Sequence, residues 1–143
     1  MLESPPERPV RRFHTIVGVL GIIAFVTTGQ VMVRHAPPVS HLDPELRLMY
    51  VSRHIYLLGA SLVNLMTGLY LQAAPGRLRR ALQLAGSVLL LLSPLLLALA
   101  FFVEPSLGLA GRSWRSSGAL FALLAGALLH GIGRIQIRRS PAT

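Results

Sequence analysis

DPELRLMYVSRHIYLLGASLVNLMTGLYLQ, residues Asp43 to Gln72, is the stretch that decides the fold of this chain. It begins with a helix-start signal, because Asp43 can cap a helix whose first residue is Pro44. An apolar run of 17 residues then extends from Ile55 to Leu71, interrupted only by small or uncharged polar residues. This length just suffices for a helix to cross the hydrocarbon core of a bilayer. The stretch therefore predicts a membrane helix with charged residues at its outer end.

Most polar side chains of this helix share one face. At 100° per residue, one arc of roughly 80° contains Tyr50, His54, Leu57, Ser61, Asn64, Gly68 and Gln72. We expect this face to point toward protein and the opposite face toward lipid. Ser61 and Asn64, with Gln30 from the preceding apolar run, are a candidate intramembrane polar stripe.

The composition is that of an integral membrane protein. Hydrophobic residues make up 52% of the chain and charged residues only 13%, against roughly a quarter charged in soluble domains. The absence of cysteine excludes disulfides, thiol catalysis and cysteine-ligated metals. The arginines that produce the net charge of +9 lie outside the apolar runs. We therefore predict that they determine the membrane topology and that the protein has no nucleic-acid partner. Arginine without lysine, beside abundant Ala, Gly, Leu and Pro, indicates a bacterial source.

Four apolar segments predict an all-α membrane protein, one domain over residues 1–143, with transmembrane helices at about 13–33, 44–72, 81–103 and 117–137. Residues 1–12 contain three prolines and are expected to be an irregular tail. Pro94 should kink the third helix, and the hydroxyl of Ser93 or a neighbouring helix should bind the carbonyl that the proline leaves free. The short connections favour an up-down bundle.

The arginines also predict the orientation. Nine of them fall on the side of the two termini and the second connection, and five fall on the other side. By the positive-inside rule both termini are cytoplasmic, which places the chain in the bacterial inner membrane as a multi-pass protein.

One candidate polar site lies at the outer edge of the membrane. Arg53 and His54 lie at the outer end of the second apolar run, and Glu104 lies at the outer end of the third. Either cation is expected to contact Glu104. Such edge charges form a binding site in some proteins and only anchor helices in others. No acidic or histidine residues nearby have a recognised ligand spacing, so no metal site is predicted.

His14 and His130 are candidate haem ligands, because both lie near the inner edge, in the first and fourth segments. A haem b iron held by two histidines needs them on opposite sides at one height. His54 lies about 20 Å away along the membrane normal, from the ~1.5 Å rise per residue. A structural role for both histidines is the alternative, and no cofactor is predicted outright.

No charged side chain is expected at mid-bilayer, where proton-coupled pumps usually need one. Small residues share one face of the first segment (Gly18, Gly21) and recur every four residues in the fourth (Gly118, Ala122, Gly126), which is typical of closely packed membrane helices. We therefore expect a non-enzymatic protein of the lipid bilayer that acts by helix association, as a homo-oligomer or as an accessory subunit of a membrane complex. Two alternatives stay open: a protein that binds haem, quinone or lipid between its helices, and a small channel or transporter lined by Asn64, Ser61 and Gln30.

Overall fold

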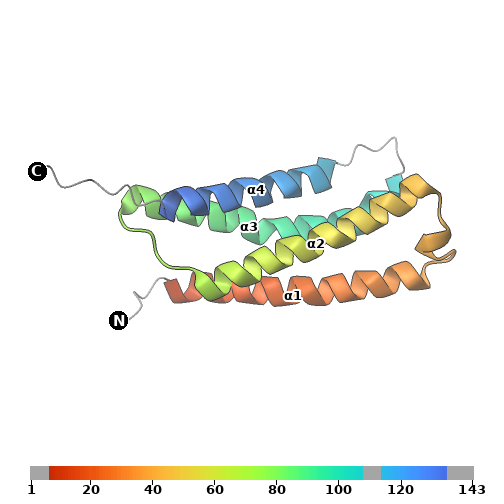
Figure 1. The fold of residues 1–143 in the computed structure, drawn as a ribbon, viewed down its shortest axis with the longest axis horizontal. Helices are drawn as coiled ribbons and strands as arrows, with labels where there is room; N and C mark the ends of the chain where they lie inside the picture. The colour runs from red at the N-terminus through yellow and green to blue at the C-terminus, as the bar shows by residue number, and fades with distance from the viewer. Residues whose placement is uncertain (1–6, 108–113, 135–143) are drawn as a thin grey trace, which may run out of the picture.

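The computed structural model describes residues 7–107 and 114–134. Within these ranges the chain is entirely helical and has no strand (Figure 1). Four long helices are joined by loops that contain two short 3-10 helices. The elements are α1 (Glu7–Arg34), η1 (Val39–His41), α2 (Pro44–Tyr70), α3 (Arg77–Val103), η2 (Pro105–Leu107) and α4 (Trp114–Arg134).

The helix bounds differ from the predicted ones mainly at the starts. α1 begins at Glu7 and includes part of the stretch predicted to be irregular, because Pro9 lies in its first turn, where a proline costs no intrahelical hydrogen bond. α3 begins directly after Gly76, whose φ of 85° makes a turn that other residues rarely adopt. α4 begins at Trp114, three residues earlier than predicted, and the predicted residues 135–137 lie outside the described residues.

Among the described residues, three stretches are long and apolar enough to cross a membrane: Arg8–Arg34, Arg77–Leu107 and Trp114–Gly133. The protein is therefore a membrane protein by the length and composition of its helices. α2 is not among the three, since polar residues such as Arg53, His54 and Asn64 interrupt the apolar sequence of this helix.

α1 packs on α2 through the face predicted from its small residues. A Cβ atom at Gly18 would lie 2.7 Å from the backbone nitrogen of Leu65, so only glycine fits there. Gly21 lies against the hydroxyl of Ser61 in the same way. The residues paired along the two helices advance in opposite directions, as the ribbon shows (Figure 1).

α3 and α4 are packed as closely. A Cβ atom at Gly126 of α4 would lie 2.9 Å from the carbonyl oxygen of Gly86 in α3. At Gly118, at the other end of the same predicted ridge, an added Cβ atom would meet no described atom of another helix within 4 Å. The predicted ridge of α4 is thus used for internal packing at one end only.

α3 is the central helix of the bundle. In an apolar 18-residue segment of this helix 44% of the residues are buried, against 17% in the corresponding segment of α1 and 22% in that of α4. One core cluster joins α2, α3 and α4 and consists of fully buried Leu57, Ala60, Leu97 and Ala119. Along α2, the contact of Arg53 with Glu104 lies before this cluster, and the contact of Asn64 with His14 lies after it.

Candidate functional site

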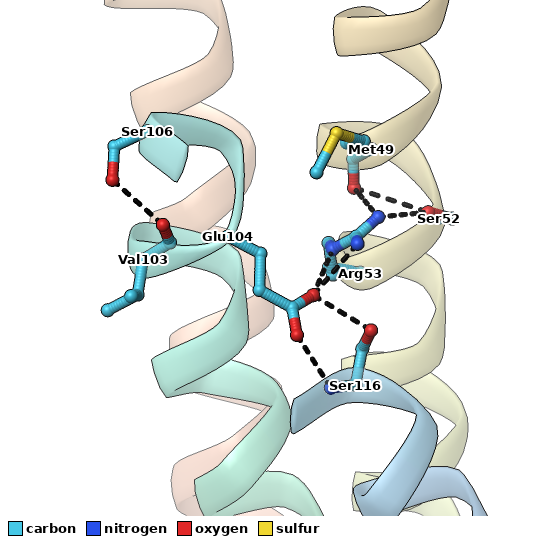
Figure 2. Close-up of polar contacts among 7 residues, drawn as sticks. All are labelled: Met49, Ser52, Arg53, Val103, Glu104, Ser106 and Ser116. Carbon is cyan, nitrogen blue, oxygen red and sulfur yellow. Dashed lines mark hydrogen bonds and ion pairs between the residues drawn. The ribbon is translucent and has the colours of Figure 1, made fainter. Parts of the chain in front are cut away.

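The predicted contact between Arg53 and Glu104 is present, and both side chains are buried (Figure 2). Nε and Nη2 of Arg53 each lie 2.8 Å from Oε2 of Glu104. Nη1 donates to the carbonyl of Met49 at 3.1 Å and to the hydroxyl of Ser52 at 3.2 Å. The guanidinium therefore joins the end of α3 to the first half of α2.

Glu104 also holds the first turn of α4 (Figure 2). The backbone N–H of Ser116 donates to Oε1 at 2.9 Å, and the hydroxyl of Ser116 donates to Oε2 at 2.8 Å. The first N–H groups of a helix have no partner within the helix, and they attract negative charge. Glu104 thus caps α4 from another helix while it neutralises Arg53. Its relative exposure is 1%.

His54 does not join this cluster. Its Nδ1 lies 2.9 Å from the hydroxyl of Thr28, and its ring stacks on Phe25 with 4.0 Å between centroids. His54 therefore links α2 to α1, whereas its neighbour Arg53 links α2 to α3. Adjacent residues on a helix point about 100° apart, which explains the division.

The carbonyl that Pro94 leaves free accepts two hydrogen bonds, one from each of the two predicted sources. Proline lacks the N–H that would bind the carbonyl of Leu90. The hydroxyl of Ser93 donates to this carbonyl at 2.9 Å, and Nδ2 of Asn64 donates to it at 2.7 Å. Asn64 therefore joins α2 to α3 at the proline.

Of the three residues of the predicted polar stripe, two lie inside the bundle and one lies outside it. Ser61 and Asn64 are fully buried, and Ser61 donates to the carbonyl of Leu57 at 2.6 Å. Gln30 instead lies exposed on the outward side of α1 and does not meet them. Ser61, Asn64 and Gln30 therefore do not line one path through the bundle.

His14 is fully buried beside Asn64, with its Nδ1 2.8 Å from Oδ1 of Asn64. Both N–H bonds of the Asn64 amide are used on the carbonyls of Ala60 and Leu90, so the amide oxygen must accept from Nδ1–H of His14. The neutral ring then carries its lone pair on Nε2. This atom is buried and has no hydrogen-bond partner among the described residues.

The two candidate haem ligands do come together. The ring centroids of His14 and His130 are 6.1 Å apart, and the ring planes are nearly perpendicular at 81°. Nε2 of His130 lies 3.1 Å from the hydroxyl of Ser87. A cavity of about 320 Å³ between α2 and α4 is lined by His130 together with Met66 and Tyr70.

Two residues that hold these sites together, Ser116 and Gln83, are not among the predicted site residues. The predicted fourth helix begins only at about residue 117, which leaves Ser116 in the loop, although serine just before an apolar run is a helix-start signal. Gln83 binds the α2–α3 loop, because its Oε1 accepts from the N–H of Ala74 and its Nε2 donates to the carbonyl of Gln72.

The described residues contain no group of three or more His, Asp or Glu side chains that could hold a metal ion. The arrangement offers a buried ion pair between Arg53 and Glu104. It also offers an asparagine amide that binds the carbonyl freed by Pro94, and a buried histidine nitrogen with no hydrogen-bond partner among the described residues. Comparison of the chain with protein-family models, with curated proteins and with solved structures found no significant match.

Proposed function

We propose that all four helices cross the bacterial inner membrane as an up-down bundle with both termini in the cytoplasm. The excess of arginine at the two termini and the α2–α3 loop supports this orientation. α2 has 27 residues, or about 40 Å at 1.5 Å per residue, so its charged first turns extend beyond a hydrocarbon core of about 30 Å. Arg53, at the edge, is neutralised by Glu104.

In this membrane the chain acts without catalysis, by associating with a second copy or with the subunits of a larger complex. The observation that supports this is Gln30. Its amide is exposed on a face of α1 that also carries the exposed apolar side chains of Ile23, Val26 and Val33. An amide on a lipid-facing surface is favourable when a neighbouring helix supplies a hydrogen-bond partner. The internal glycines of α1 give no such support, because α2 already covers them.

Mass measurement in mild detergent tests the association. Replacing Gln30→Leu should reduce the assembled fraction several-fold, from a loss of about 0.6–1.7 kcal/mol per interhelical hydrogen bond. Gln72→Leu is the matched control, because Gln72 is exposed in the loop after α2. A strictly monomeric chain with no stoichiometric partner contradicts the proposal.

A second candidate, the binding of haem or of a quinone, is favoured by the bare Nε2 of His14. A lone pair on Nε2 is the form that binds haem iron, and donation from the other nitrogen to an amide oxygen is typical of metal-bound histidine. The same lone pair could accept a hydrogen bond from a quinol hydroxyl.

An absorbance spectrum of the purified chain separates these ligands. Bound haem gives a Soret band that His14→Ala and His130→Ala both abolish, whereas a quinone is found by extraction and mass analysis. His41→Ala is the control, since His41 is exposed in η1. A colourless protein that yields no quinone contradicts this second candidate.

A further inference from the structure

The start of α1 carries a basic cavity beside the end of α2. It measures about 470 Å³, and its polar wall is formed by Arg8, Arg11 and Arg12. Ile16 and Leu69 form the apolar part of the lining. None of the described residues that line the cavity is acidic. The lining therefore combines concentrated positive charge with an apolar surface.

Arg11 is fixed in place by the end of α2. Its Nε donates to the carbonyl of Gly68 and its Nη2 to the carbonyl of Leu69, both at 3.2 Å. The last carbonyls of a helix have no partner within the helix and favour a cation. The close approach depends on Gly68, because a Cβ there would lie 2.6 Å from the backbone nitrogen of Thr15. These contacts attach the start of α1 to the end of α2 on one side of the cavity.

A second cavity of about 470 Å³ continues on the other side of Arg8 and Arg12, where Phe13 and Ile16 line it. These two apolar side chains are 59% and 53% exposed. The arginines lie at the beginning of the membrane-length stretch Arg8–Arg34, which is the level of lipid headgroups. The charged part of this surface therefore lies where the headgroup of a phospholipid lies, and its apolar part lies where the acyl chains begin.

We propose that this basic cavity is a binding site for an anionic phospholipid. The guanidinium groups of Arg8 and Arg12 bind the phosphate oxygens, in the paired geometry that arginine forms with phosphate. The acyl chains lie along Phe13, Ile16 and Leu69. The proposal requires only that α1 crosses the membrane, so it stands apart from the association and the ligand of His14.

The test is a lipid titration of the full chain in phosphatidylcholine nanodiscs doped with phosphatidylglycerol, with bound lipid counted by native mass spectrometry. The Arg8→Gln/Arg12→Gln variant should bind phosphatidylglycerol about 25-fold more weakly, from about fivefold for the loss of each direct hydrogen bond between an arginine and the phosphate. Arg77→Gln/Arg80→Gln is the control, because it removes the same charge from exposed positions at the start of α3. It should lose less than threefold.

Equal losses in the two variants would overturn the proposal, because the attraction would then come from the whole basic surface. It is also overturned if inorganic phosphate binds as tightly as the lipid, or if a second copy of the chain covers the cavity and excludes lipid. The variants are compared only after their melting temperatures in phosphatidylcholine are shown to agree. If the double variant unfolds, Arg12→Gln alone should still lose about fivefold.

Discussion

The carboxylate of Glu104 is shared by three helices, since it ends α3, binds Arg53 of α2 and caps α4 through Ser116. Buried ion pairs contribute little net stability when complete, but they are costly when one partner is removed. Removing one partner of the pair should therefore cost more stability than replacing both partners.

Arg53→Met should therefore lower the free energy of unfolding by about 3–5 kcal/mol, because it leaves the Glu104 carboxylate buried without its cation. Arg53→Met/Glu104→Gln should recover part of this loss. Denaturant unfolding in detergent micelles measures both. Arg47→Met is the control, since Arg47 is exposed on the same helix; a similar loss there would show that the burial of the pair is not the cause.

The proline inside α3 is a feature at the scale of the element. Pro94 leaves the carbonyl of Leu90 without a partner in its own helix, and Asn64 of α2 supplies one. The proline of α3 thus creates the need for a hydrogen-bond donor on α2, which Asn64 meets.

Asn64→Leu should destabilise the bundle by about 1–2 kcal/mol, since it removes a donor from Leu90 and an acceptor from His14. In a Pro94→Ala background the loss should be smaller, because alanine restores the backbone N–H. A double-mutant cycle on unfolding free energies measures this coupling. Equal losses in both backgrounds would contradict the link between the asparagine and the proline.

Helix-to-helix distance is a second property of the elements. Gly18→Ala should cost about 1–3 kcal/mol, because its methyl group would meet the backbone of Leu65 and push α1 away from α2. Gly59→Ala is the matched change in the same helix pair, with no atom within 4 Å. It should stabilise by about 0.5–1 kcal/mol through helix propensity. Thermal unfolding of the two variants should shift in opposite directions.

At the scale of the whole molecule, the open question is the path of the chain through the membrane. The protein has no cysteine of its own, so single introduced cysteines report on topology without background. Ser40→Cys, in η1, should react in intact cells with a membrane-impermeant maleimide. Arg77→Cys should react only after the inner membrane is permeabilised. The reverse pattern would invert the proposed orientation. Reaction of both in intact cells would show that α2 does not cross.

Much of the architecture was predictable from the sequence. Apolar runs long enough to span a bilayer, ended by proline, glycine and arginine, determined four helical segments, since these signals act within a few residues of the chain. The contact of Arg53 with Glu104 was predictable from depth, because both end an apolar run at the same side. The freed carbonyl of Leu90 was predictable from Pro94, because the missing N–H is a property of that residue alone.

The tertiary structure alone decided which polar group meets which. Gln30 was grouped with Ser61 and Asn64 by its place in an apolar run, but the rotation of α1 turns it outward. His54 faces α1, and Glu104 reaches the first turn of α4. These pairings depend on how each helix is rotated and which neighbour it meets. Rotation and pairing follow from the close packing of side chains distant in the sequence, which no local pattern encodes.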